Sequence, residues 1–354
     1  MKNAIFSLAA VAVLSAGSAF ARDLDTVTLG SASPWSPYGA SLMFGEELGY
    51  FAEEGLEPEF VSVQGSSVLI PQLANKSIDF GWPNADLTII ALERGEPFPV
   101  KFFLNAYTTQ VFEFVVPADS DIESLADLEG KTMGVGALGW GNIPMSRAML
   151  ADAGVTWQED VQVVPVGLGP QAWSRLTSGS VDALNLFVHQ HEQMILSGID
   201  LKRIPMPDKF QTIFSNGWAT HEDTIAERPE LVAAMGRIIA KSTLACQANL
   251  EACVRAYWEF DPASKPAPED EAKWIEETVH LNEADIGVIM SNMDPDRFGY
   301  YSNESWENFI SALSVGGQIE GTDIDYQQLF TNELIEAIND FDRDEVMAEA
   351  QAAQ

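Results

Sequence analysis

Basic residues are scarce in this chain. It has 19 Lys and Arg against 53 Asp and Glu, which gives a formal net charge of −34 at pH 7. Because binding to nucleic acid and to anionic lipid rests on Lys and Arg, this balance excludes nucleic acid as a partner. Histidine is also rare, and His189 and His191 lack the further nearby ligands that zinc needs. The sequence therefore predicts no cofactor and no metal site.

Long hydrophobic runs are missing beyond the N-terminus, where no stretch reaches the ~20 apolar residues of a membrane span. The start of the chain has one short apolar run, from Ala4 to Ala16, after Lys2 and before the small residues Ala19 and Ala21. This layout is typical of a secretory signal peptide. We expect residues 1–21 to be removed and the product to be exported to the periplasm.

Motifs of nucleophilic catalysis are missing as well. The chain has no G-x-S-x-G sequence and no cysteine beside a plausible base. Its Asp and Glu residues are too numerous for one pair to stand out as an acid and a base. No catalytic residue is predicted, and the protein is not expected to be an enzyme.

Cysteine is limited to Cys246 and Cys253. On one straight helix their Cα atoms would lie about 10.5 Å apart, too far for a disulfide. Asn249 between them is a good helix N-cap, and a break there would bring the sulfurs together in an oxidising compartment. Two alternatives follow: a disulfide across a helix break, or two small buried thiols.

Short β-like runs alternate with amphipathic helical patterns up to about residue 218. This rhythm indicates an α/β fold with mainly parallel sheets. A second unit begins at 112–117, and the β-like run 211–220 leaves it again. The later part is mostly helical and is expected to pack on the first unit, while the last residues, 344–354, are expected to fray.

This organisation predicts two lobes with a ligand cleft between them. The first lobe is discontinuous and comprises residues 22–111 and 215–354, and the second comprises residues 112–214. In open α/β sheets ligands bind outside the carboxyl ends of the strands. Residues in the loops after the strands are therefore the candidates for ligand contact.

One motif points to a different function. Gly134 to Gly139 spells G-x-G-x-x-G between a β-like run and a helical pattern, the context of a dinucleotide site. Pro144 delays the helix start past the glycines, and no acidic residue ends the next β-like run, so this function is disfavoured. The alternative is a loop whose backbone amides and Trp140 line a pocket and favour the negative end of a small ligand.

Small hydroxyls, amides and aromatic rings recur after the other β-like runs. Such groups suit a pocket that stacks a flat or compact ligand and orients it by hydrogen bonds. The predicted ligand-binding residues are Ser33, Trp35, Tyr38, Gly65, Ser66, Trp82, Asn84, Tyr107, Gly136, Trp140, Asn142, Asn185, Asn216 and Trp218. Arg147 and Arg175 are weaker candidates for a carboxylate or sulfonate contact, because each can equally pair with a surface acid.

Four segments carry a resemblance to a known family: PYGASLMFGEELGYFAEEGLEPEFV, SLADLEGKTMGVG, VDALNL and NLEACVRAYWEFDP. Together they resemble the nitrate, sulfonate and taurine (NitT/TauT) class of periplasmic substrate-binding proteins, which is related to the binding proteins for thiamine pyrimidine precursors. The resemblance implies a type II periplasmic binding protein, in which each lobe is a mainly parallel sheet flanked by helices. It also implies a monomer that closes by a hinge around a small-molecule solute and delivers it to an ABC transporter permease in the inner membrane.

The nature of the solute is left open at this point. Residues 184–189 read LNLFVH where relatives often place an acidic residue followed by Pro, which argues against a taurine-like ligand. A sulfonate- or carboxylate-like anion, with or without an aromatic ring, fits the amide-rich loop. A pyrimidine or thiamine-precursor heterocycle fits the Trp residues equally and the acidic balance better. An exported enzyme using the same cleft, or a sensor that presents the solute to a receptor, are the alternatives outside transport.

Overall fold

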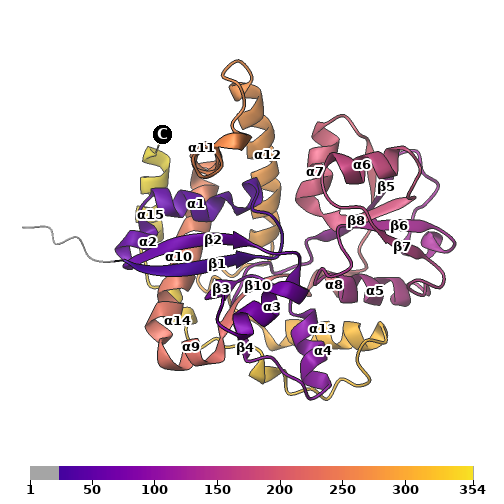
Figure 1. The fold of residues 1–354 in the computed structure, drawn as a ribbon, viewed down its shortest axis with the longest axis horizontal. Coiled ribbons are helices and arrows are strands. Elements are labelled where there is room, and N and C mark those ends of the chain that lie inside the picture. The colour runs from indigo at the N-terminus through magenta and orange to yellow at the C-terminus, as the bar shows by residue number, and fades with distance from the viewer. Residues whose placement is uncertain (1–23, 354) are drawn as a thin grey trace, which may run out of the picture.

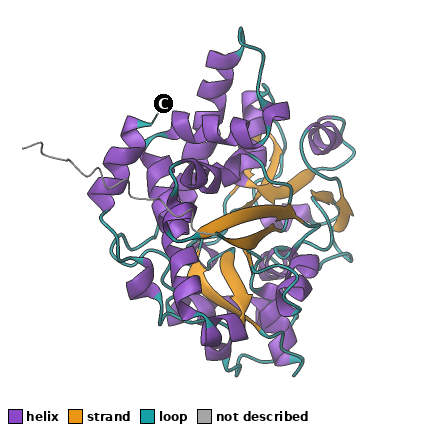
Figure 2. Ribbon diagram, turned by 60° about the vertical axis from the view of Figure 1, so that its left-hand side comes forward, coloured by secondary structure: helices purple, strands orange, loops and turns teal. Residues whose placement is uncertain are grey.

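The computed structural model describes residues 24–353, so the expected signal peptide lies outside the described residues. Two five-stranded sheets lie side by side, each with helices around it (Figure 1). Helices cover the outside of both bodies, and the strands lie within (Figure 2). No helix among the described residues is long and apolar enough to cross a membrane.

The sheet of the first lobe has the strand order β2-β1-β3-β10-β4. Its strands are β1 (Asp25–Ser31), β2 (Leu56–Ser62), β3 (Phe80–Gly81), β4 (Val100–Asn105) and β10 (Gly217–His221). Four of them run in one direction, while β10 runs antiparallel to both β3 and β4. The intervening helices are η1 (Pro37–Gly39), α1 (Ala40–Glu47), α2 (Tyr50–Glu53), α3 (Ser66–Ala74) and α4 (Asp86–Glu93).

The sheet of the second lobe has the order β7-β6-β8-β5-β9 and repeats this topology. Its strands are β5 (Phe112–Pro117), β6 (Thr132–Val135), β7 (Gln162–Pro165), β8 (Ala183–Phe187) and β9 (Leu201–Ile204). Here β5 is the antiparallel strand, between β8 and β9. The helices are η2 (Leu125–Leu128), α5 (Ile143–Asp152), α6 (Pro170–Thr177), α7 (Val188–Leu196) and α8 (Asp208–Gln211).

The antiparallel strand of each sheet is the strand that the chain reaches directly after it crosses between the lobes. The first crossing joins β4 to β5, and the second leads through α8 to β10. The predicted fold class, two mainly parallel sheets flanked by helices, is therefore confirmed. The lobe limits at 112 and 214 stay a prediction, although β5 and β10 begin close to them.

The C-terminal third is helical, as the pattern indicates. It contains α9 (Glu222–Glu227), α10 (Pro229–Ala248), α11 (Leu250–Phe260), η3 (Pro262–Ser264), α12 (Glu271–Met290), α13 (Asn303–Val315), η4 (Tyr326–Gln328), α14 (Ile335–Ile338) and α15 (Arg343–Ala352). Most of these helices pack on the first lobe, but α12 also packs on α7, and α13 packs on α5 of the second lobe. The C-terminal segment thus contacts both lobes.

The end of the chain differs from the expectation that it frays. Residues 343–352 form α15, whose Val346 and Ala350 are buried and which packs on α10. The Asp342 side chain caps this helix by accepting hydrogen bonds from the backbone amides of Asp344 and Glu345. Burial of an apolar face together with a good N-cap holds this terminal helix in place.

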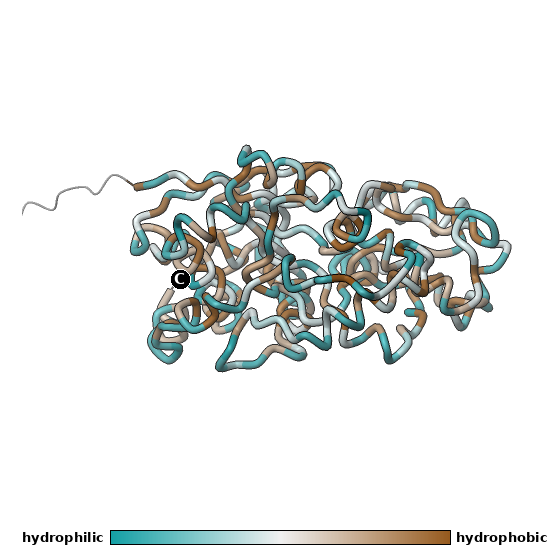
Figure 3. Tube along the Cα trace, turned by 90° about the horizontal axis from the view of Figure 1, so that it is seen from below, coloured by the Kyte–Doolittle hydropathy of each residue, from teal (hydrophilic) through white to brown (hydrophobic). Residues whose placement is uncertain are grey.

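The apolar residues lie inside both lobes, and the hydrophilic stretches concentrate at the outer turns (Figure 3). One aromatic cluster fixes α13 beside the second crossing. Phe214 lies 4.7 Å from Trp306, ring centre to ring centre, and Trp306 stacks on Phe330 at 5.1 Å. Trp306 is fully buried, so this cluster anchors the C-terminal segment to the chain just before β10.

The two cysteines form a disulfide, which is one of the two alternatives that the sequence left open. Cys246 and Cys253 are bonded, with their Cα atoms 5.2 Å apart. Helix α10 ends at Ala248 and α11 begins at Leu250, and the Asn249 side chain accepts a hydrogen bond from the Ala252 amide. The N-cap at Asn249 breaks the helix as expected and brings the two cysteines together.

The disulfide closes a short loop, so its removal is expected to cost about 2–3 kcal/mol of unfolding free energy. Replacing both cysteines, Cys246→Ser with Cys253→Ser, should lower the midpoint of urea unfolding. A reducing agent should lower the midpoint of the parent protein to a similar value and leave the variant unchanged. Equal midpoints for the oxidised parent and the variant would contradict this prediction.

Candidate functional site

Two adjoining cavities lie between the lobes. The first encloses about 450 Å³, part of it open to solvent, and is lined by Ser31, Ala32, Ser33, Trp82, Tyr107, Val111, Phe112, Phe187, Val188, Asn216 and Asp285. The second encloses about 320 Å³ and is lined by Ala32, Ser33, Gly65, Ser66, Asn84, Phe112, Trp140, Gly141, Phe187 and Asn216. Five residues line both cavities, so together they form one binding region of a size suited to a small organic ligand.

The strand directions explain why these residues meet. Ser31 ends β1, and Trp82 directly follows β3, so both lie at the carboxyl edge of the first sheet. Asn216 precedes β10 and reaches the same edge because β10 runs the opposite way. In the second sheet, Phe112 begins the antiparallel β5 and pairs in register with Phe187 at the end of β8.

Stacked aromatic rings form the wall of the first lobe. The Trp82 ring stacks on Trp35 with 5.8 Å between ring centres, and on Trp218 with 5.4 Å. Tyr107 lies 6.1 Å from Trp82 on the cavity side. Both neighbouring rings stack on Trp82 and fix its position, so Trp82 forms a rigid part of the apolar cavity wall.

Three further rings form the facing wall of the second lobe. Phe112, Trp140 and Phe187 lie between 6.0 and 6.2 Å from one another, ring centre to ring centre. Gly136 makes room for this arrangement, since a Cβ atom there would lie 2.0 Å from the Trp140 ring. The glycine-rich turn that resembles a dinucleotide motif therefore serves to seat Trp140.

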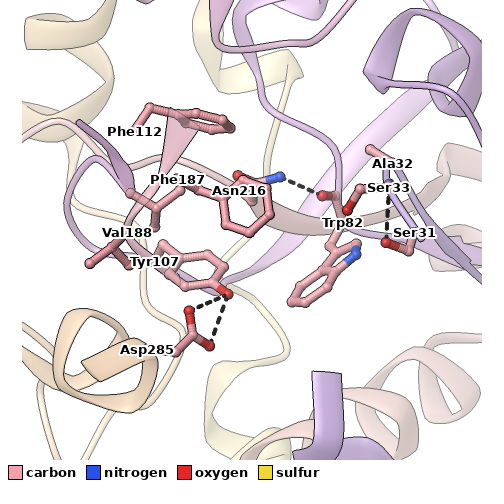
Figure 4. Close-up of a pocket in the computed structure, with 11 residues that line it drawn as sticks. Ser31, Ala32, Ser33, Trp82, Tyr107, Phe112, Phe187, Val188, Asn216 and Asp285 are labelled. Carbon is pink, nitrogen blue, oxygen red and sulfur yellow. Dashed lines mark hydrogen bonds between the residues drawn. The ribbon is translucent and has the colours of Figure 1, made fainter. Parts of the chain in front are cut away.

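One buried carboxyl group lies at the end of the first cavity. Asp285 on α12 is 5% exposed, and both of its oxygens lie 3.4 Å from the Tyr107 hydroxyl, which donates to them (Figure 4). Burial raises the pKa of Asp285 to about 7, and the Tyr107 hydrogen bond opposes this rise only in part. Among the described residues that line the two cavities, Asp285 is the only charged type, and Lys, Arg and His are absent.

The sequence analysis did not single out Asp285. The sequence did hold a signal for its burial, because Asp285 falls on one face of α12 at the spacing of an apolar helix face. The buried residues of this face are Thr278, Leu281, Asn282, Asp285 and Ile286. Polar residues on such a face are unusual and need partners. The sequence does not say that this face meets a cavity rather than a core, so the signal alone would not have identified a site. The aromatic residues Phe112 and Phe187 were likewise assigned only to strands.

The structure brings eight of the fourteen predicted ligand-binding residues to the cavity walls. Those that line them are Ser33, Gly65, Ser66, Trp82, Asn84, Tyr107, Trp140 and Asn216, with Trp35 stacked directly behind Trp82. Trp218 also stacks on Trp82 without lining either cavity, and Gly136 lies against the Trp140 ring. The side chain of Tyr38 is outside the described part of the structure. The role of each residue as a ligand contact stays a prediction.

Two predicted residues, Asn142 and Asn185, lie inside the second lobe instead. Both are fully buried, and the Asn142 side-chain amide donates to the Asn185 side-chain oxygen at 3.1 Å. Ser146 donates to the same oxygen at 2.7 Å. Their hydrogen bonds join the start of α5 to β8, so they support the loop that carries Trp140. Arg147 and Arg175 line neither cavity.

Several contacts hold the two lobes together around the cavities. Ser67 on α3 donates to the Gly139 carbonyl at 2.8 Å, and Gly65 allows this approach because a Cβ there would lie 2.6 Å from the same oxygen. On the other side, His280 of α12 lies 3.0 Å from Glu192 of α7. The two lobes thus contact each other on both sides of the cavities.

A buried carboxyl group of the first lobe contacts the start of α5. Asp86 of the first lobe is fully buried, and its Oδ1 atom accepts a hydrogen bond from the Met145 amide at 3.1 Å. Burial raises the pKa of Asp86 well above its usual value, more strongly than the hydrogen bonds lower it. The sequence analysis expected this helix start to face the negative end of a ligand, whereas Asp86 takes one of its amides.

One of the two histidines, His191, is part of a hydrogen-bonded ion network, whereas His189 lies 3.3 Å from the Gln193 side-chain amide. His191 and Arg203 both contact Glu113, and Arg203 also contacts Glu192. Burial alone would raise the pKa of Glu113, but the hydrogen bond with His191 and the charge of Arg203 lower it below its usual value. Within residues 24–353, no three His, Cys, Asp or Glu side chains gather in a group that could hold a metal ion.

The raised pKa of Asp285 predicts a pH-dependent stability. An unfolded chain ionises Asp near pH 4, so between about pH 4 and pH 7 the folded state holds a proton that the unfolded state has lost. The free energy of unfolding therefore falls as pH rises through this window, by about 4 kcal/mol at most.

Asp285→Asn removes this effect. Its melting temperature should exceed that of the parent protein by several degrees at about pH 8 and by much less at about pH 4.5. Glu283→Gln, at an exposed position of the same helix, is the matched control and should show no such trend. A constant difference between Asp285→Asn and the parent across this range would show that the carboxyl group titrates normally.

Comparison with known proteins gives relatives of one kind. Residues 36–252 match the family model described as NMT1/THI5 like. The chain is 22% identical to the riboflavin-binding protein RibY of Chloroflexus aurantiacus, over 81% of this chain and 79% of the relative. It is 25% identical to the formylaminopyrimidine-binding protein of Halalkalibacterium halodurans, over 77% of this chain and 80% of the relative.

A solved structure shows the same fold. The alkanesulfonate-binding protein SsuA of Xanthomonas axonopodis superposes with a TM-score of 0.59 at 13% identity, over 87% of this chain and 99% of the other. The family model covers more than half of the chain, and the two sheets and their helices agree with the fold of the periplasmic binding proteins. The protein belongs to the NMT1/THI5-like family and has the fold of the periplasmic solute-binding proteins that serve ABC importers.

Proposed function

We propose that this protein is an exported solute-binding protein that captures a nitrogen-containing heteroaromatic compound, uncharged or cationic, and delivers it to an ABC importer. The observation that carries this proposal is the chemistry of the cavity lining. Aromatic rings face each other across the cleft, and the charged group among the described lining residues is the buried Asp285. Flat rings with polar edges match such a site.

The sequence analysis placed a sulfonate- or carboxylate-like anion first, and two features argue against it. An anion in the first cavity would meet the Asp285 carboxylate with no Lys, Arg or His among the described lining residues to offset the repulsion. The Met145 amide near the start of α5 donates to Asp86, so it does not face the cavity as an anion donor. The heterocycle, the second hypothesis from the sequence, fits both features.

The names of the two relatives agree with this choice. Riboflavin and formylaminopyrimidine are both nitrogen heteroaromatic compounds, and each of these relatives covers more than three quarters of this chain. The likeness to the alkanesulfonate-binding protein is one of fold alone, because 13% identity carries no ligand information. The shared chemistry of the named ligands therefore supports a heteroaromatic solute more than a sulfonate.

In this proposal the protein acts as a monomer in the periplasm and performs no chemistry. An open form exposes Trp82 and Tyr107 on one lobe and Phe112, Trp140 and Phe187 on the other. The solute bridges the two walls, and closure forms contacts such as those between Ser67 and Gly139. An exported enzyme using the same cleft is the rival, and it is distinguished by recovering the solute unchanged after incubation.

A thermal-shift panel tests the proposed ligand class. Riboflavin and 4-amino-2-methylpyrimidine represent the heteroaromatic class, while taurine, an alkanesulfonate and nitrate represent the anions. A ligand present at 100 times its dissociation constant adds about 2.7 kcal/mol to the free energy of unfolding. We expect a rise in melting temperature with a heteroaromatic compound and none with the anions. A rise with an anion alone would refute the proposal.

Loss of the stacking surface should weaken binding. Trp82→Ala removes the ring held between Trp35 and Trp218, so it should raise the dissociation constant of the bound heterocycle at least tenfold. It should also lower the melting temperature of the free protein, because Trp82 is buried. Trp140→Ala should weaken binding with a smaller loss of stability, since Trp140 is half-exposed.

The matched control for both variants is Trp274→Ala. Trp274 lies on α12, is 48% exposed, and lines neither cavity. Isothermal titration should give this variant the dissociation constant of the parent protein. Parent-like affinity in Trp82→Ala and Trp140→Ala as well would remove both rings from the binding site.

A further inference from the structure

Asp285 is placed to read one edge of a bound ring. It comes from α12, in the C-terminal helical segment, whereas the ring walls come from loops and strands of both lobes. In Figure 4 its carboxyl group lies beside the Tyr107 hydroxyl, at one end of the cluster formed by Tyr107, Phe187 and Val188. A flat solute held between the aromatic walls would present an edge, not a face, to a group in this position.

The hydrogen-bonding capacity of this carboxyl group is largely unused. A carboxylate has about four acceptor sites, and a hydroxyl supplies one proton. Within the described part of the chain, the recorded donor to Asp285 is the Tyr107 hydroxyl, which is 3.4 Å from both oxygens, longer than an ordinary O–H···O bond. A buried carboxylate with so little support is costly, and a donor from a ligand would relieve that cost.

From this geometry we propose that Asp285 is the specificity-determining residue of the site: it accepts a hydrogen bond from a ring N–H or amino group of the solute. The site then takes heteroaromatic rings with a donor edge and rejects rings of the same shape whose edge only accepts. This inference rests on the proposed function and names the feature of the solute that is recognised. Aminopyrimidines and flavins share that feature, the first through an exocyclic amine and the second through a ring N–H.

The selectivity follows from the cost of a mismatch. A donor meets the carboxylate in a charge-assisted hydrogen bond, which is about twice as strong as a neutral one. A solute acceptor at the same place gives the Asp285 carboxylate no hydrogen bond. It also brings a lone pair of the solute against a lone pair of the buried carboxylate. The raised pKa of Asp285 agrees with this picture, because it shows a carboxyl group that lacks donors before a solute arrives.

Two pairs of probes test the inference and separate the two sources of the donor. The first pair is 4-amino-2-methylpyrimidine and 4-methoxy-2-methylpyrimidine, and the second is riboflavin and its N3-methyl derivative. In each pair the second compound keeps the ring and loses the donor. Isothermal titration at about pH 8, where Asp285 is ionised, measures the ratio of the two dissociation constants.

In the parent protein, at least one donor compound should bind at least tenfold more tightly than its donor-free partner. Asp285→Leu removes the acceptor and should bring this ratio close to one, and Asp285→Asn, which keeps an uncharged acceptor, should give an intermediate ratio. Glu283→Gln, an exposed carboxylate on the same helix, should keep the parent ratio. Melting curves of each variant show that it is folded at the titration temperature.

The outcomes separate the inference from the function beneath it. A ratio near one in the parent protein for every pair that binds overturns the role of Asp285 and leaves the heteroaromatic site standing. A parent-like ratio in Asp285→Leu also overturns it and places the selectivity elsewhere. Failure of all four compounds to bind the parent protein overturns the proposed ligand class and the inference together.

Discussion

The geometry of the cleft depends on one topological constraint, the antiparallel strand that each sheet receives where the chain crosses between the lobes. Because β10 runs against its neighbours, Asn216 at its start lies at the same sheet edge as Trp82 after β3. The antiparallel β5 does the same for Phe112, which pairs with Phe187 at the end of β8. Each crossing therefore adds a cavity-lining residue to the sheet edge where the parallel strands have their carboxyl ends, and both lobes present that edge to the cleft.

The C-terminal helices complete this site and limit how the lobes are arranged. Helix α12 packs on α7 of the second lobe and contributes Asp285 to the first cavity. Helix α13 packs on α5 and is anchored through Trp306 to Phe214, just before β10. The segment that follows the two lobes in sequence is thus part of the cleft and of the contact between the lobes, and does not simply cover the first lobe.

Charge acts differently on the surface and in the cleft. The 53 acidic residues are spread along the chain, so together they repel anions in general rather than at one place. Two carboxyl groups are buried at decisive places, Asp86 against the start of α5 and Asp285 at the end of the first cavity. Burial raises the pKa of both, so their surroundings disfavour added negative charge at short range as well.

Local patterns were enough to predict several features. The alternation of short strands and helices indicates the α/β class, Pro144 delays the start of α5, and Asn249 breaks the helix between the two cysteines. The segments after the strands supplied seven residues that line the cavities, and Asn216, directly before β10, is the eighth. Each of these features depends on a preference that acts over a few residues, such as helix capping, the fixed φ of proline, or the position of a loop at a strand end.

Other features arise only from contacts between segments that are distant in sequence. Asp285 lies on a helix whose polar residues signal unusual burial, but it lines a cavity only because α12 packs on α7 of the second lobe as well as on the first lobe. Asn142 and Asn185 have the residue type of ligand contacts, yet they bond to each other inside the second lobe.

The sequence by itself thus determined the fold class and the helix break, because these follow from propensity and periodicity. Only the tertiary structure decided which carboxyl group lines the cavity and which amide of α5 is already occupied. Those two facts depend on groups more than 50 residues apart in the chain meeting in a buried space.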